Sequence, residues 1–487
     1  MKRLIYKITT LTLILVLMNW IYNRFMFKSD LKKFSDEIEL SWKVAEDNCQ
    51  IVYTGESSNH TSAPYDNDKR WISDYISDYF PMMKCGNMTK NASHGEVYYH
   101  LLNNIPENAA VETVIVTMNL RSFGYDWIES NLETAIQKQL VLLKDNPPLF
   151  NRFLLAFKAY DIKNDSERNE IRAYHRRNDK LVFPYPFKYD NVADWDYAKA
   201  CQKIIDNDGN RNQRLTELAC HYIKGFAFII DEENPRIKDF DNIVALAEKR
   251  GWNLVFNLMA ENVDRINELV GSDLIFLMKQ NRDYLINRYE HLDNVTVVDN
   301  LDDLRNDMFI DKHWISEHYC EMGRRTIANN VAQAVRQYHP DMYVDVDDIK
   351  CPKNHYRISL ASDSINICPS NYYKMLIEDK TSEIENDAEK VYISGKIWRE
   401  QLSENHEIVM ELYKNNIEIQ HNKISVNDLV QTTNKWDFFT TVLPIDSTFF
   451  DADSFKIFLH NDSESQVYIK TLDVSFEYDK YARKGKQ

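Results

Sequence analysis

The stretch "IVYTGESSNHTSAP", residues 51–64, begins with apolar and β-branched residues and reaches Gly55 before Glu56, Ser57 and Ser58. Such a run predicts a buried strand that ends at the glycine. In a parallel sheet, the polar residues that follow a strand lie at the edge where functional sites form. The stretch therefore raises the question of whether Ser57, or its neighbour Ser58, is held in place as a reactive hydroxyl.

Further apolar runs of strand length occur at 111–120 ("VETVIVTMNL"), 252–260 ("WNLVFNLMA") and 294–300 ("NVTVVDN"). Helical spacing is found at 240–251 and 323–338, while 273–289 fits either a strand or a helix. Alternating strands and helices predict an α/β domain over 49–345, with a parallel sheet covered by helices on both faces. The segment 128–235 is longer than a crossover needs, and we interpret it as a helical insertion that covers or shapes the site.

The pattern changes near 345–355. The short runs "KVYISGKIW", "EIVMELYKN", "WDFFTTVLPI", "FKIFLHND" and "QVYIKTLDVSFEYD" alternate apolar and polar residues and are separated by polar turns. Short alternating runs of this kind are typical of an antiparallel β-sandwich. We therefore expect an all-β, jelly-roll-like second domain over 350–487, and a chain of 487 residues is long enough for two domains.

The N-terminus carries a targeting signal. Residues 4–27, "LIYKITTLTLILVLMNWIYNRFMF", follow Lys2 and Arg3 and approach the ~20 residues that span a bilayer. We find no small-x-small cleavage site after the apolar centre, so we favour an uncleaved transmembrane anchor within 1–27 over a signal segment. Residues 28–48 are then a stalk or a first helix, and we expect the rest of the chain outside the cytoplasm, periplasmic or at the cell surface.

Charge and cysteine content exclude some classes. The net charge is −16 and no long basic run is present, which argues against nucleic acid as a partner. The seven cysteines form no CxxC pair, which argues against a zinc knuckle or a thioredoxin-like site. Cys351 with Cys368, or Cys201 with Cys220, could form a disulfide. We expect no cofactor and no metal.

A candidate base lies late in the α/β region, in "FIDKHWISEHYCEMGRRTIA", residues 309–328. It contains Asp311, His313, Glu317 and His318. A serine hydroxyl becomes a nucleophile when a histidine removes its proton, and a carboxylate holds that histidine in place.

Two further positions suggest an oxyanion site. Gly95, in "NASHGEVYYHLL", precedes a helix, whose N-terminal N–H groups favour negative charge. Asn119 ends the run at 111–120, where it could also be a simple turn former. The neighbouring Arg121 could contact substrate or be a solvated charge.

The order of these blocks resembles the SGNH (GDSL-like) hydrolase family over residues 49–340. In that family the blocks supply a nucleophilic serine, a glycine N–H, an asparagine side chain and a base histidine. The resemblance implies Ser57 as nucleophile and His318 as base. It also implies an oxyanion hole formed by the Ser57 N–H, the Gly95 N–H and Asn119.

The chain departs from the family pattern at two places. Glu56 stands where the family usually has Asp, and Ile315 stands where the family has the Asp that precedes the histidine by three residues. The partner of His318 must then be Asp311, which we favour, or Glu317. His313 is a rival base, in a register that loses the spacing of His318 to Gly323.

The resemblance implies acyl transfer through serine. We expect hydrolysis of acyl esters, above all O-acetyl esters, of a carbohydrate, with an acylated polysaccharide as substrate. The alternatives are an acyltransferase that uses the same residues and an inert, membrane-anchored carbohydrate-binding or assembly protein. Aromatic residues of the second domain, Tyr392, Trp398 and Trp436, are candidates for sugar contacts, although a buried core is the commoner fate of Trp.

Overall fold

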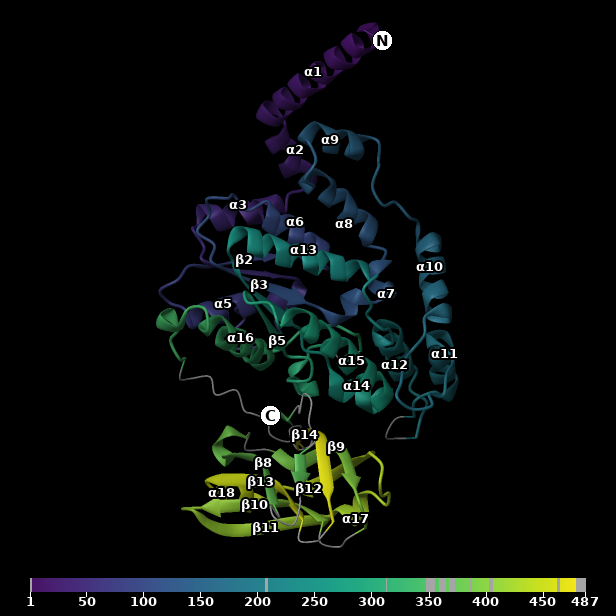
Figure 1. Cartoon of the computed structure of the whole chain (residues 1–487), viewed down its shortest axis with the longest axis vertical. Helices are drawn as coiled ribbons and strands as arrows, with labels where there is room; N and C mark the ends of the chain where they lie inside the picture. The colour runs from purple at the N-terminus through teal and green to yellow at the C-terminus, as the bar shows by residue number, and fades with distance from the viewer. Residues whose placement is uncertain are drawn as a thin grey trace. The chain divides into compact units, whose positions relative to one another are not determined.

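The chain divides into two compact units, residues 1–346 and 347–487. The computed structural model describes residues 2–205, 209–311, 313–346, 355–358, 365–367, 373–384, 388–402, 406–461 and 465–478. Figure 1 shows helices and a sheet in the first unit and strands in the second.

A five-stranded parallel sheet with the order β2-β1-β3-β4-β5 forms the centre of the first unit. Its strands are β1 (Ile51–Gly55), β2 (Cys85–Thr89), β3 (Thr113–Met118), β4 (Asn253–Leu258) and β5 (Val295–Asp299). Every residue of β1 and β3 is buried, as expected for central strands covered on both faces. The strand order changes direction between β1 and β3, the place where open α/β sheets form their sites.

Alternate side chains of the strands enter two different cores. Val52 and Val114 lie in the core formed with α3 (Ile38–Glu46), α6 (Gly95–Asn103), α13 (Pro235–Arg250) and α15 (Ser272–Tyr289). Ile51 and Ile115 point to the opposite face, against α5 (Ile72–Asp78) and α16 (Glu321–Arg336). Figure 1 shows α6 and α13 on one side of the sheet and α5 and α16 on the other. The expected three-layer α/β architecture is confirmed.

A helical segment separates β3 from α13. It contains η1 (Leu120–Phe123), α7 (Tyr125–Ile128), α8 (Glu133–Leu140), η2 (Val141–Leu143), α9 (Pro148–Ala156), α10 (Asp165–Asn178), α11 (Val192–Gln202) and α12 (Gln213–Phe226). Most of α10 is exposed, whereas α12 buries eight of its residues. The region expected to be a helical insertion therefore holds one helix packed deeply into the core and others at the surface. A shorter helix, α14 (Val263–Leu269), follows β4.

Of the two structures expected for residues 28–48, a stalk or a first helix, the structure has helix. After α1 (Lys2–Phe25) come α2 (Phe27–Phe34) and α3, and both contribute buried side chains to the core. Leu31, Ile38 and Val44 are each at most 5% exposed. Residues 28–48 are therefore part of the first unit, because their apolar face is covered by it. Within the described residues, α1 is the one helix long and apolar enough to cross a membrane, and its apolar stretch is not buried in the protein.

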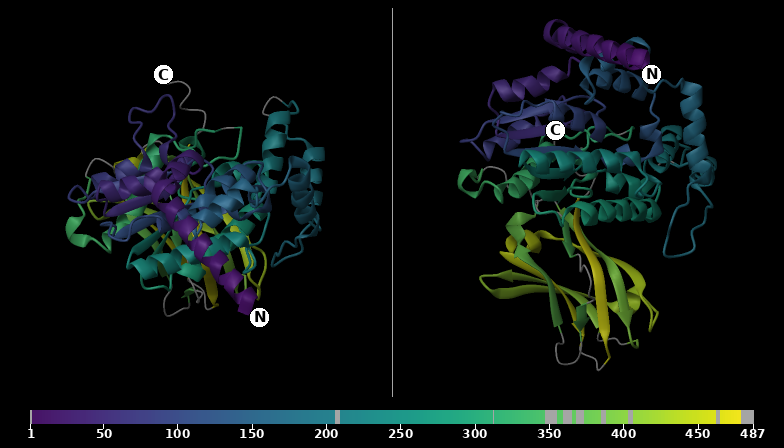
Figure 2. Two further views of the ribbon diagram at one scale, coloured as in Figure 1. Left: turned by 90° about the horizontal axis from the view of Figure 1, so that it is seen from above. Right: turned by 45° about the horizontal axis from the view of Figure 1, so that its top comes forward.

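The second unit consists of two antiparallel sheets with the orders β11-β10-β13-β8 and β12-β9-β14-β6, the latter with β7 paired to β14. The strands are β6 (His355–Ile358), β7 (Ile365–Ile367), β8 (Tyr373–Lys380), β9 (Ala388–Arg399), β10 (His406–Lys414), β11 (Ile417–Ser425), β12 (Asp437–Pro444), β13 (Ser454–Asn461) and β14 (Val467–Tyr478). Side chains of both sheets, among them Ile408 and Phe455 of one and Ile393 and Phe476 of the other, share one core. Figure 2 shows the strands of this unit in another view. The expected antiparallel sandwich is confirmed.

Candidate active site

Ser57 lies two residues after the end of β1, as the first residue of the short helix α4 (Ser57–His60). Neighbouring side chains leave little room for a side chain at Gly55. A Cβ at position 55 would lie 2.6 Å from Cε1 of Tyr53 and 3.0 Å from Oγ1 of Thr117. A larger residue at position 55 would therefore require the Tyr53 ring and the Thr117 side chain to shift.

The imidazole of His318 contacts this serine. The distance between Ser57 Oγ and His318 Nε2 is 2.9 Å, and the two residues are 261 positions apart in the chain. On the other side of the ring, His318 Nδ1 lies 2.8 Å from Asp311 Oδ2. With the ring proton on Nδ1, His318 donates to the carboxylate and accepts at Nε2 from the serine hydroxyl, the arrangement of a serine–histidine–carboxylate triad.

A folded-back loop brings Asp311 to His318 despite their separation of seven residues. Phe309 and Tyr319 form an antiparallel bridge, and the Ile310 N–H donates to the His318 carbonyl at 2.9 Å. The chain between these pairs closes on itself. The Ser316 hydroxyl also donates to Asp311 Oδ2, so the carboxylate is held from two sides.

Glu317, the other candidate partner, points away from the imidazole. Its Oε2 accepts from Arg121 Nη2 at 2.7 Å, and its side chain is 4% exposed. His313, the rival base, is exposed on the same loop. The structure thus brings Ser57, His318 and Asp311 together and leaves Glu317 and His313 elsewhere.

The amide of Asn119 is fixed at both ends. Its Oδ1 accepts from the Arg121 N–H at 3.0 Å, and its Nδ2 donates to Glu56 Oε1 at 2.6 Å. A side-chain amide has two N–H donors, so one remains for a substrate oxygen after the bond to Glu56. Glu56, the residue directly before Ser57, therefore sets the orientation of Asn119.

Gly95 opens α6, at the end of the loop that leaves β2, the strand paired with β1. The glycine permits close packing of helices, because a Cβ at this position would lie 2.9 Å from Cβ of Asp239 on α13. Its N–H thus belongs to the edge of the sheet at which Ser57 lies.

The Arg121 side chain, 11% exposed, lies among three buried glutamates: Glu56, Glu261 and Glu317. Its Nη1 also donates to the Ile315 carbonyl at 2.8 Å, so it ties the loop that carries His318 to the end of β3. Burial, with the nearby charge of Glu317, raises the pKa of Glu56 to about 7. Burial likewise raises the pKa of Glu261 well above its usual value. Burial therefore favours the protonated form of Glu56 and of Glu261.

This cluster was not predicted from the sequence. Of the two roles expected for Arg121, that of a solvated charge is wrong, because its side chain is 11% exposed and pairs with Glu317. A contact with substrate stays a prediction. Glu261 follows β4 at the same edge of the sheet, and that position was its one available signal.

Trp314 is an exposed aromatic residue beside the triad. It lies on the loop between Asp311 and His318, and 53% of its surface is exposed. Its ring rests against His221 of α12, with 4.5 Å between the ring centroids. Gly225 of the same helix lies close to Ile315, since a Cβ there would be 2.9 Å from Ile315 Cδ1. The helical insertion therefore supports the loop that carries His318.

The aromatic candidates of the second unit differ in exposure. Trp398 is partly buried and meets Tyr468 edge to face, with 5.2 Å between centroids. Trp436 is 38% exposed. The side chain of Tyr392 lies outside the described part of the structure.

One group of buried side chains has the composition of a metal site. Potential ligand atoms of His94, Glu96 and Glu133 lie within 4.8 Å of one another. The Gln137 amide donates to both carboxylates, and Arg236 Nη2 lies 3.6 Å from Glu133 Oε2. Arg236 thus pairs with the charge of Glu133, and the Gln137 amide donates to both carboxylates, so we interpret the group as a structural polar cluster.

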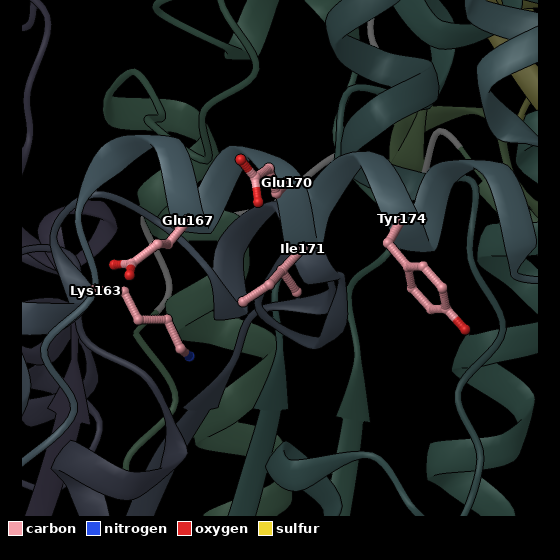
Figure 3. A pocket seen from close by; sticks show the side chains of 5 residues that line it. All are labelled: Lys163, Glu167, Glu170, Ile171 and Tyr174. Atoms are coloured by element: carbon pink, nitrogen blue, oxygen red, sulfur yellow. The ribbon is translucent and has the colours of Figure 1, made fainter.

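An open hollow of about 480 Å³ lies beside α10 and does not include the triad. Figure 3 shows its lining side chains, which come from α10 and the residue before its cap: Lys163, Glu167, Glu170, Ile171 and Tyr174.

The five cysteines of the described residues are all free: Cys49, Cys85, Cys201, Cys220 and Cys320. A bridge between Cys201 and Cys220 is therefore wrong for this structure. Cys351 and Cys368 lie outside the described residues.

Comparison with known proteins gives distant structural similarities. No family model matches the sequence, and no curated protein matches it. A lipase/acylhydrolase from Enterococcus faecalis is similar at 10% identity and a TM-score of 0.27, over 60% of this chain and 96% of that one. A two-domain esterase active on acetylated mannans, co-crystallised with mannopentaose, is similar at 8% identity and a TM-score of 0.24, over 91% of this chain and 95% of that one.

The VP2 subviral particle of infectious bursal disease virus is similar at 11% identity and a TM-score of 0.19. That match covers 26% of this chain and about a third, 32%, of the VP2 chain. At these identities and TM-scores, the similarities do not by themselves assign a function to this chain.

Proposed function

We propose that this chain is a serine-dependent ester hydrolase of the SGNH type that removes acyl groups, above all acetyl groups, from carbohydrate outside the cytoplasm. The observation that carries the proposal is the contact series from Ser57 Oγ through His318 to Asp311, at 2.9 and 2.8 Å. An inert binding protein has no need of these three polar groups in line. The geometry therefore favours an enzyme over the binding or assembly protein.

The proposed reaction begins when His318 Nε2 takes the hydroxyl proton and Ser57 Oγ attacks the ester carbonyl carbon. The Ser57 N–H, the Gly95 N–H and the free N–H of Asn119 stabilise the negative oxygen. His318 then gives its proton to the departing sugar oxygen as the ester C–O bond breaks. Water, deprotonated by the same imidazole, attacks the acyl enzyme, releases the acid and restores the serine.

Carbohydrate as the substrate class is supported by Trp314. Sugar rings present apolar C–H faces that pack well on an aromatic ring, and this Trp is exposed at the loop that carries the base. Export is supported by α1, a helix of 24 residues that is apolar enough to enter a membrane.

The chemistry is tested with p-nitrophenyl acetate and a fluorophosphonate probe. We expect hydrolysis and covalent labelling by the wild type, and the loss of both in Ser57→Ala. The matched control is Ser58→Ala, which removes the neighbouring hydroxyl. Wild-type protein that is folded and inert to both reagents would refute the proposal.

The substrate class is tested separately, by release of acetate from acetylated mannan and xylan. We expect Trp314→Ala to lose activity on the polymers but to retain activity on p-nitrophenyl acetate. Equal losses on both substrates would contradict a sugar-binding role. Formation of an acylated sugar faster than free acid, when an acceptor glycan is added, would show an acyltransferase instead.

A further inference from the structure

Helix α9 (Pro148–Ala156) presents an aromatic face to solvent. Phe150, Phe153 and Phe157, at the end of the helix, are 49%, 39% and 79% exposed. Positions i, i+3 and i+7 lie within about 60° of one another around a helix. Asn151 and Leu155, on the other side, are buried. We call the three phenylalanines the α9 aromatic face. Three exposed aromatic side chains on one helix face are unusual for a surface in contact with water alone.

This face is attached to the end of α1. The Leu149 N–H, in the first turn of α9, donates to Asn19 Oδ1 of α1 at 2.9 Å. One carboxylate also joins the elements: Asp30 Oδ2 accepts from Tyr22 Oη of α1 at 2.8 Å and from Arg152 Nε of α9 at 2.8 Å. Figure 1 shows α9 beside the junction of α1 and α2. The two helices are therefore held in a fixed relation.

The point of attachment matches the depth at which a spanning helix leaves the hydrocarbon. From Lys2 to Asn19, α1 rises by about 26 Å at about 1.5 Å per residue, close to the hydrocarbon thickness of about 30 Å. The first turn of α9 thus lies at the level of the headgroups when α1 is inserted. Arg24 and Lys158, which are exposed near the ends of α1 and α9, suit anionic headgroups.

We propose that the α9 aromatic face docks into the lipid–water interface of the bilayer that α1 spans. The inference rests on insertion of α1 and is independent of the ester chemistry. Phenylalanine rings bury apolar area at the acyl–headgroup boundary, while the buried side of α9 stays packed on the first unit. Two contacts with the membrane, one across it and one along it, fix the tilt of the unit relative to the bilayer.

The test uses the full chain reconstituted in vesicles of phosphatidylcholine and phosphatidylglycerol that carry an alkyne-tagged lipid. The photoreactive residue p-benzoylphenylalanine replaces Phe153 or Phe157, one position at a time. The matched control carries it at Tyr174 of α10, which is 59% exposed. We expect about tenfold more lipid adduct at positions 153 and 157 than at 174, because an interfacial side chain meets lipid continuously.

Each other outcome overturns the proposal. Equal lipid adduct at all three positions would show non-specific contact. A crosslinked dimer at 153 or 157 would show that a second copy covers the face. Extraction of the wild-type chain by alkaline carbonate would show that α1 does not insert. Melting curves of the substituted proteins exclude unfolding as the source of any difference, and the two independent positions guard against a local defect in one of them.

Discussion

The assignment of Asp311, rather than Glu317, as the carboxylate partner of His318 leads to a quantitative prediction. Asp311→Ala removes a charge-assisted hydrogen bond of 2.8 Å. Such bonds contribute about 1.5–3 kcal/mol, which corresponds to a fall in kcat of about 10- to 150-fold. The two side chains are 36% and 27% exposed, so solvent screening favours the lower part of this range.

The assay is single-turnover and steady-state hydrolysis of p-nitrophenyl acetate, with melting temperature measured in parallel. Glu317→Gln is the matched control, because Glu317 adjoins His318 in sequence but bonds Arg121. We expect this variant to melt at a lower temperature with a smaller loss of kcat. The reasoning is refuted if Glu317→Gln lowers kcat more than Asp311→Ala while its melting temperature is unchanged.

Three further predictions concern the surrounding groups. Asn119→Ala should lower kcat for p-nitrophenyl acetate by about 10²–10³-fold, because an oxyanion donor is lost, and should change KM little. A rise in KM as large as the expected fall in kcat would indicate a role in substrate binding instead. Arg121→Met should destabilise the fold by about 3–5 kcal/mol in urea unfolding, because Glu317 is left buried and unpaired, and Arg121→Lys should recover part of the loss. Burial raises the pKa of Glu56 from 4.5 to about 7, so the native state keeps a proton that the unfolded chain loses. The Glu56 carboxyl alone should therefore lower the free energy of unfolding by about 3 kcal/mol between pH 5 and 8. In Glu56→Gln, the free energy of unfolding should depend less steeply on pH.

Much of the sheet could be predicted because its central strands are continuously apolar. The runs at 51–55, 113–118 and 253–258 are buried on both faces, and such strands are conspicuous in a sequence. β2 was not predicted, since "CGNMT" is an edge strand of partly exposed residues with a glycine. β11 was missed for a similar reason, because its residues are largely exposed and polar. The segment 272–289 is a helix, since 18 residues are too many for one strand.

The candidate residues that follow strands could be predicted from the sequence. The pairing of two residues within a loop that folds back on itself was harder to predict. Ser57 and Asn119 each lie within two residues of the end of a recognisable strand. The pairing of Asp311 with His318 depends on the bridge between Phe309 and Tyr319, which no local spacing reveals. The buried cluster at Arg121 could not be predicted, because its members come from four separate segments and charged residues are usually solvated.

The bridge between Phe309 and Tyr319 has a consequence for recognising related sequences. His318 and Asp311, the proposed base and its carboxylate partner, belong to one loop whose ends are joined by backbone hydrogen bonds. The loop can gain or lose residues between Asp311 and His318 while the bridge between Phe309 and Tyr319 is kept. A search pattern with a fixed interval between aspartate and histidine would then pass over homologues, whereas a pattern anchored on the flanking aromatic pair would find them.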